Sequence, residues 1–80
     1  MLDFNISSKL QKDLSVLRIS GEIDIHTAPK LKKFFKQLLE KGQHKIILNL
    51  NKVRYIDSTG LGTIVYLSQE IAKFKGLVRL

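Results

Sequence analysis

The chain has 80 residues, the size of one domain, and 44% of them are hydrophobic and 26% charged, as in a globular protein rather than a disordered or fibrous one. Cysteine is absent, which excludes a disulfide framework and thiolate metal sites. No apolar run approaches the length of a membrane span, and the start Met-Leu-Asp-Phe has no basic region or apolar stretch typical of a secretory signal. We therefore expect a small, soluble domain located in the cytoplasm.

The formal net charge is +7, which raises the question of a nucleic acid or an anionic membrane as partner. The excess is spread along the chain, with +3 in residues 1–44 (eight basic, five acidic) and +4 in residues 45–80 (six basic, two acidic). The densest basic group falls on the polar positions of one predicted helix: Lys30, Lys32, Lys33, Lys36 and Lys41. No aromatic residue interleaves these lysines on that face, as a platform for stacked bases requires. We interpret them as a solvated helix face and expect no direct nucleic-acid or membrane partner, although charge alone leaves a nucleic-acid-binding domain open.

The first part of the chain predicts a β-hairpin. Residues 2–10 alternate between apolar and polar side chains, a period of two that indicates a half-exposed strand. A polar turn at residues 11–13 leads into a second strand from Leu14 to Ser20, which we expect to be the antiparallel neighbour of the first.

A helix is the clearest element that follows. Apolar residues recur at intervals of three and four from Ala28 to Leu39. Thr27 is the expected N-cap, Pro29 suits the first turn, and Gly42 ends the helix.

The remaining chain predicts a buried strand, a loop, a helix and a short final strand. Residues 45–50 form a nearly continuous apolar run, typical of a parallel strand covered on both faces, and residues 51–56 are predicted to be the loop that leaves it. The second helix is expected from Ser58 or Thr59 to Lys75, ended by Gly76, with a strand over residues 77–80.

The fold class that follows is α/β, with a small mixed β-sheet of about four strands and helices mainly on one face. The final strand would leave an unfinished sheet edge. A homodimer or a domain swap through that edge is therefore left open.

The segment Asp57-Ser58-Thr59-Gly60-Leu61-Gly62 is the most informative for function, because it follows a buried strand and opens a helix. Ser58 is expected to cap the first backbone N–H groups of that helix. Gly60 and Gly62 remove bulk beside the two hydroxyls, so that the backbone of another molecule can approach closely. The carboxyl end of an inner strand is also where α/β sheets usually place their working residues.

Other interpretations of this segment are a helix cap without further function, a phosphate cradle and a serine nucleophile. The spacing matches neither of the glycine-rich phosphate motifs nor the nucleophile elbow. His26 and His44 are expected to be surface or loop residues, and no cluster of His, Asp or Glu has the spacing of metal ligands. We therefore predict no metal, no cofactor and no enzymatic activity.

Three motifs together resemble the STAS family, most closely the bacterial anti-sigma factor antagonists. They are Gly21-Glu22-Ile23-Asp24 with Thr27-Ala28-Pro29-Lys30-Leu31, then Ile47-Leu48-Asn49-Leu50, then Tyr55-Ile56-Asp57-Ser58-Thr59-Gly60-Leu61-Gly62. The match covers roughly residues 14 to 76 and implies a single STAS-like domain over residues 1–80. Since the family usually continues for another strand and one or two helices, the resemblance implies a chain truncated at its C-terminus.

The resemblance implies partner switching. An anti-sigma factor, which is a serine kinase of the histidine-kinase-like ATPase fold, binds the unphosphorylated antagonist and releases its sigma factor. Phosphorylation of Ser58 then ends binding, and a PP2C-type phosphatase restores the active form. Thr59 stays open as a second acceptor. The residues expected to contact the partner are Asp24, Thr27, Asp57, Thr59, Gly60 and Leu61. The alternative is a STAS scaffold or sensor module in a stressosome-like assembly.

Overall fold

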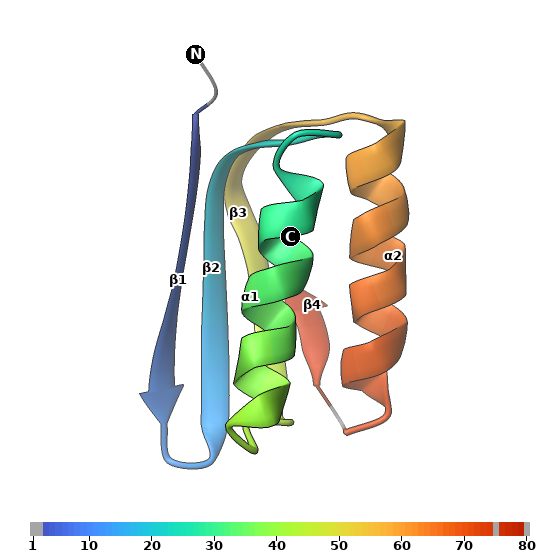
Figure 1. The fold of residues 1–80 in the computed structure, drawn as a ribbon. Helices are drawn as coiled ribbons and strands as arrows, with labels where there is room; N and C mark the ends of the chain where they lie inside the picture. The colour runs from blue at the N-terminus through green and yellow to red at the C-terminus, as the bar shows by residue number, and fades with distance from the viewer. Residues whose placement is uncertain (1–2, 75, 80) are drawn as a thin grey trace.

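A computed structural model describes residues 3–74 and 76–79 of the chain as one four-stranded sheet with two helices. The order of elements is β1 (Phe4–Gln11), β2 (Leu14–Ile23), α1 (Ala28–Glu40), β3 (Ile46–Ile56), α2 (Ser58–Ala72) and β4 (Leu77–Arg79). The strands lie side by side in the order β1-β2-β3-β4, and both helices cover the same face (Figure 1). The predicted α/β class, with a small mixed sheet and helices on one face, is confirmed.

The hairpin is confirmed, since β1 pairs antiparallel with β2 from Phe4↔Gly21 to Gln11↔Leu14. A two-residue turn closes it, and Lys12 takes a positive φ of 59° there. The strand starts at Phe4, and the predicted start at Leu2 lies outside the described residues.

The prediction of a loop over residues 51–56 is wrong, because β3 continues through Ile56. This half of β3 pairs in parallel with the end of β2, which itself runs past Ser20 to Ile23, and two register shifts interrupt the pairing. Lys52 and Arg54 are exposed here, so the apolar pattern of a buried strand is lost. Backbone pairing with β2 holds these residues in the sheet instead.

The helix α1 ends as predicted. Gly42 has a φ of 80°, its N–H bonds to Leu39 O at 3.0 Å, and the Gln43 N–H bonds to Leu38 O at 3.0 Å, which together form a Schellman motif. The second helix begins at Ser58 but ends at Ala72, three residues before the predicted Lys75, which lies outside the described residues. The strand predicted after Gly76 is present as β4.

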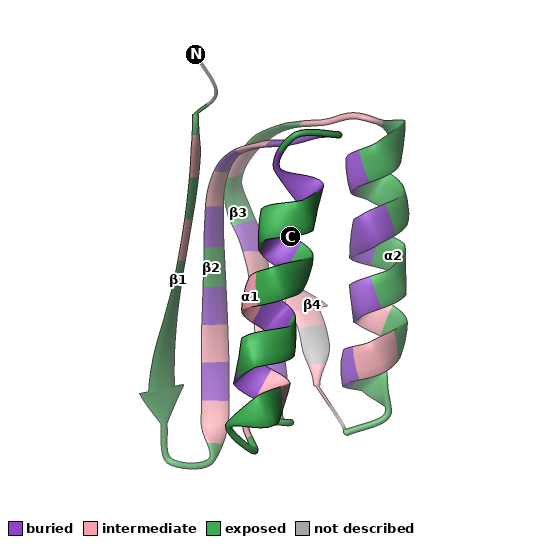
Figure 2. Cartoon of the chain, viewed as in Figure 1, coloured by how far each residue is buried: buried purple, intermediate pink, exposed green. Residues whose placement is uncertain are grey.

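The core lies between the sheet and the two helices. Its buried side chains are Leu17, Ile19, Ile23, Leu31, Phe35, Leu38, Ile46, Leu48, Leu50, Ile64, Leu67 and Ile71. Figure 2 shows buried positions along β2 and along one side of each helix, whereas most of β1 is exposed. The central strands are therefore covered, and β1 forms an outer edge that the helix layer covers only in part.

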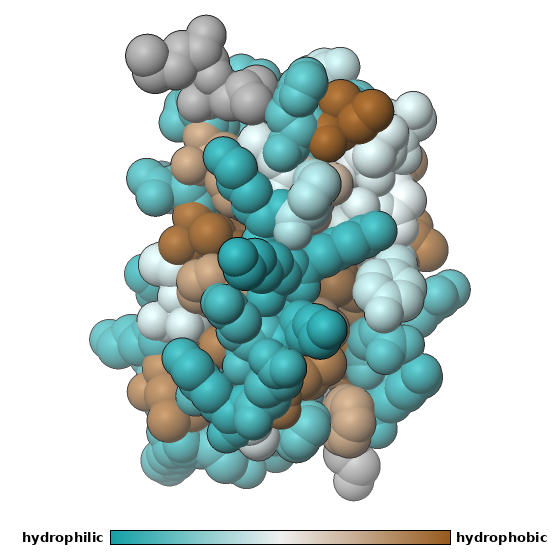
Figure 3. All heavy atoms as spheres, viewed as in Figure 1, coloured by the Kyte–Doolittle hydropathy of each residue, from teal (hydrophilic) through white to brown (hydrophobic). Residues whose placement is uncertain are grey.

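The lysines of α1 lie on its exposed side, as predicted, and Figure 3 shows hydrophilic side chains gathered over this helix. Neither α1, with 13 residues, nor α2, with 15, reaches the length and apolarity of a membrane span; this holds for the described residues.

Candidate functional site

The candidate site is the end of the sheet where β2 and β3 finish and α2 begins. Asp57, between β3 and α2, joins the two chain segments that meet there. Its N–H donates to Ile23 O at 3.1 Å, and its Oδ2 accepts the Ile25 N–H at 3.2 Å. Ile23 is the last residue of β2 and Ile25 lies just after the strand, both more than thirty residues earlier in the chain. Asp57 therefore fixes the start of α2 against the β2–α1 loop.

The N-cap of α2 is Asp57, so the prediction that Ser58 caps the helix is wrong. The Asp57 Oδ1 accepts the Gly60 N–H at 2.7 Å, and its carbonyl accepts the Leu61 N–H at 2.8 Å. A carboxylate at this position also interacts favourably with the positive end of the helix dipole. Ser58 is consequently the first residue of the helix, and its hydroxyl is not needed for capping.

Ser58 and Thr59 are both exposed. Within residues 3–74 and 76–79, neither hydroxyl takes part in a hydrogen bond. Their backbone N–H groups lie in the first turn, where the helix itself supplies no acceptor. The structure thus places two free hydroxyls and two unpaired donors at the surface of one helix end.

Asp24 and Thr27 form a buried network within the β2–α1 loop. The Asp24 Oδ1 accepts the N–H groups of His26 at 2.8 Å and Thr27 at 3.0 Å, and the Thr27 hydroxyl donates to Glu22 O at 2.9 Å. Burial raises the pKa of Asp24, but these hydrogen bonds outweigh it, so the pKa lies below its usual value.

Thr27 occupies the predicted N-cap position of α1, but its side chain makes no capping bond to that helix. Its hydroxyl accepts the Asp24 N–H at 2.9 Å instead, because the loop folds back on itself. Thr27 is fully buried and Asp24 is 8% exposed. Both therefore shape the loop that carries Ile25, and their predicted contact with a partner stays a prediction.

The two glycines of α2 differ in surroundings. A Cβ on Gly60 would overlap the carbonyl oxygen of Ile23 and lie 2.8 Å from its carbonyl carbon, so Gly60 allows the helix to pack on the end of β2. The prediction that it leaves space for an approaching molecule is wrong. A Cβ on Gly62 meets nothing within 4 Å, so the open position is Gly62.

Three apolar side chains are exposed around Ser58 and were not grouped by the sequence analysis. Ile25 is 61% exposed, Leu61 56% and Val65 48%. Leu61 and Val65 follow Ser58 by three and seven residues and share its helix face, a spacing that the sequence alone contains. Ile25 lies next to the start of the helix because its backbone N–H bonds to Asp57, a contact that the sequence does not reveal. We name Ser58, Ile25, Leu61 and Val65 the α2 surface.

Both histidines, His26 and His44, are exposed and lie outside the helices and strands, as predicted. The ring of His44 lies 4.8 Å from that of Phe74. Among the described residues, no three His, Asp or Glu side chains come together in a way that could hold a metal ion.

Comparison with known proteins gives a consistent result. The family model for the STAS domain matches residues 5–80. An anti-sigma-B factor antagonist of Staphylococcus epidermidis is 34% identical over 64 residues, which cover 80% of this chain and 59% of that protein. The chain thus spans about three fifths of the length of the curated relatives it matches.

Solved structures share the fold. An anti-sigma factor antagonist from Mycobacterium paratuberculosis superposes with a TM-score of 0.81 at 25% identity, covering 95% of this chain and 66% of that one. The Bacillus cell fate determinant SpoIIAA in its phosphorylated form gives a TM-score of 0.70 at 23% identity, covering 98% and 70%. The second likeness supports the fold alone.

Proposed function

Since the chain belongs to the STAS domain family, we propose that it acts as an anti-sigma factor antagonist. In its unphosphorylated form it binds an anti-sigma factor serine kinase through the α2 surface, which releases a sigma factor. Phosphorylation of Ser58 ends this binding, and a PP2C-type phosphatase restores it. The domain catalyses no reaction of its own and works in the cytoplasm.

The observation that carries this proposal is the exposed Ser58 hydroxyl at the first position of α2, with capping left to Asp57. A kinase must bring a hydroxyl into line with the transferred phosphoryl group, so the acceptor has to be reachable and free of internal hydrogen bonds. Thr59 meets the same two conditions at the next position. The curated relatives' description as anti-sigma-B factor antagonists supports the same role.

The apolar part of the α2 surface supports binding of a protein rather than of a small ion. Three large apolar side chains are exposed to solvent here: Ile25, Leu61 and Val65. Burying such residues in an interface gains about 25 cal/mol per Å² of apolar area. The serine therefore lies beside the side chains that would contact the partner.

Phosphorylation would act on the interface more than on the fold. A phosphoserine carries about −1.5 to −2 charge. The free N–H groups at the start of α2 favour an anion, so the domain tolerates it. The partner, however, would have to desolvate that charge beside the Asp57 carboxylate, and each 1.4 kcal/mol lost weakens binding about tenfold.

The test is to incubate the domain with ATP and candidate anti-sigma kinases encoded in the same genome, and to map the modified residue by mass spectrometry. We expect phosphate on Ser58 and loss of the complex. Ser58→Ala should bind without being modified, and Ser58→Asp should not bind. Thr59→Val separates the two possible acceptors, and the phosphate should still map to Ser58 in this variant. A stable complex without modification would instead support a scaffold or sensor module.

A further inference from the structure

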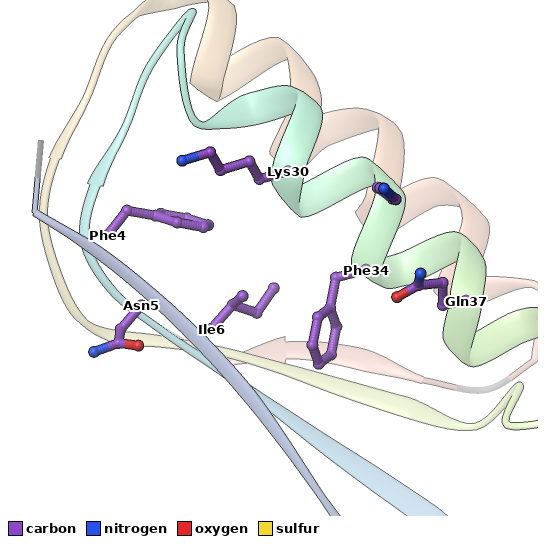
Figure 4. Close-up of a pocket in the computed structure, with 7 residues that line it drawn as sticks. Phe4, Asn5, Ile6, Lys30, Phe34 and Gln37 are labelled. Carbon is purple, nitrogen blue, oxygen red and sulfur yellow. The ribbon is translucent and has the colours of Figure 1, made fainter.

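A second surface lies at the free edge of the sheet, on the side of α1 away from α2. We name it the β1–α1 groove; it has a volume of about 340 Å³. Phe4 and Ile6 of β1 and Phe34 of α1 line its apolar part, and Lys30 and Lys33 of α1 stand along it. Figure 4 shows Phe4, Ile6 and Phe34 pointing into the space between the strand and the helix.

The groove exists because α1 covers β2 and reaches β1 only in part. Phe4, Ile6 and Phe34 pack against the core from one side and remain half-buried. Further along the same face of β1, Leu10 is 57% exposed. The helix-facing side of β1 therefore keeps apolar surface that no described residue covers.

The backbone of β1 is free along the same edge. Among the described strands β1 pairs only with β2, over eight residues and without a register shift. Proline and bulges, which usually block an edge strand, are absent from β1, and Lys9 is its single charge. Unpaired N–H and C=O groups thus run beside the groove, as they do where a domain accepts an added strand.

The charge of the groove selects the occupant. Lys30 and Lys33 take part in no ion pair within the described residues, and no acidic side chain lines the groove. A second copy of the chain would bring a domain of the same net charge, +7, with its own Lys30 and Lys33, to this edge. Like charges placed together oppose that pairing, whereas acidic side chains would be attracted.

We propose that β1 and the β1–α1 groove bind an extended acidic peptide segment of a partner protein by strand addition. Alternate side chains of an added strand point to the same face. Apolar side chains on the helix-facing side of the segment would fill the groove, and flanking Asp or Glu side chains would reach Lys30 and Lys33. This docking surface is separate from the α2 surface and does not depend on the function proposed for Ser58.

The experiment titrates the isotopically labelled domain with the capped peptide Glu-Glu-Val-Thr-Val-Glu-Glu at physiological salt, and follows the backbone amides by NMR. We expect shifts along β1 and the first half of α1. The peptide with lysine in place of every glutamate should not bind. Methylation of every second backbone nitrogen of the peptide should abolish binding where those nitrogens pair with β1. Methylation of the other set should leave binding unchanged, because an added strand pairs through one edge only.

Charge reversal on the protein supplies a matched pair of variants. Lys30→Glu with Lys33→Glu should weaken binding by about tenfold or more. Lys32→Glu with Lys36→Glu makes the same change of net charge on the side of α1 that faces Tyr66, and should change affinity by less than about twofold.

Several results would overturn the proposal. They are equal losses of affinity in the two double variants, binding of the lysine peptide, equal effects of the two methylation patterns, or no shifts of the backbone amides. A domain that is already dimeric through protected β1 amides would show that a second copy occupies the edge instead.

Discussion

Gly60 and Gly62 stand two residues apart on α2, and replacing each with alanine tests how the site is assembled. At Gly62 the new methyl group enters open space. Alanine is favoured over glycine inside a helix by about 1 kcal/mol. We therefore expect Gly62→Ala to raise the free energy of unfolding by about 0.5–1 kcal/mol.

Gly60→Ala should lower the free energy of unfolding, although the helix gains the same propensity from alanine. The new methyl carbon would overlap the Ile23 carbonyl oxygen. It would lie 2.8 Å from the Ile23 carbonyl carbon and 2.9 Å from the Ile23 Cγ2. The start of α2 would have to move away, which stretches the Asp57 N–H bond to Ile23 O, now 3.1 Å, and the Ile25 N–H bond to Asp57, now 3.2 Å. Each such bond contributes about 1 kcal/mol, and overpacking typically costs about 1–3 kcal/mol.

The net expectation is a loss of about 1–3 kcal/mol for Gly60→Ala, so the two variants differ by roughly 1.5–4 kcal/mol. Urea unfolding followed by circular dichroism measures this difference, and an unchanged dependence on urea shows that stability alone has changed. Stability equal to the parent for Gly60→Ala, or an equal loss for Gly62→Ala, would refute the packing of α2 on the end of β2.

Three further predictions concern the loops of the site. Asp57→Ala should lose about 1–2 kcal/mol of unfolding free energy in urea titrations, because the cap on Gly60 and the bond to the β2–α1 loop both disappear. Asp57→Asn keeps the cap and should lose about half as much. Equal losses for the two variants would argue against a double role of Asp57. The pKa of Asp24 is lowered from 3.8 in the folded state, so the carboxylate contributes stability above pH 3.8 and this contribution is lost as the pH falls through the folded pKa. In acid unfolding, the difference in free energy of unfolding between the parent and Asp24→Asn should therefore shrink below about pH 3.8. A difference that does not depend on pH would contradict this prediction. Thr27→Val leaves the Glu22 carbonyl and the Asp24 N–H without their partner and should lower the free energy of unfolding by about 1–3 kcal/mol. Thr27→Ser keeps both bonds and should be the more stable of the two variants in thermal unfolding. The opposite ranking would exclude this network.

Much of the fold follows from patterns within single elements. The alternation in the first strand, the helical spacing from Ala28 to Leu39 and the glycine at 42 all describe their own segment, and the structure confirms each. The second half of β3 escaped prediction because its side chains are largely exposed, and its strand conformation depends on the neighbouring β2.

The candidate site divides in the same way. The order of Asp57, Ser58 and Gly60 placed a hydroxyl at the start of a helix, which the structure confirms. It did not show that Asp57 performs the capping, because serine and aspartate are both suitable caps and only the backbone geometry distinguishes them.

The sequence by itself determined most of the helices and strands, the start of the second helix with its hydroxyl, and the STAS family, because periodicity and motif order are properties of the chain. Only the tertiary structure decided that Ile25 lies at the start of α2, that Gly60 faces a carbonyl while Gly62 faces solvent, and that β1 borders an apolar groove. Each of these depends on segments far apart in the sequence being packed together. No local pattern contains the distance between a residue and a neighbour supplied by another element.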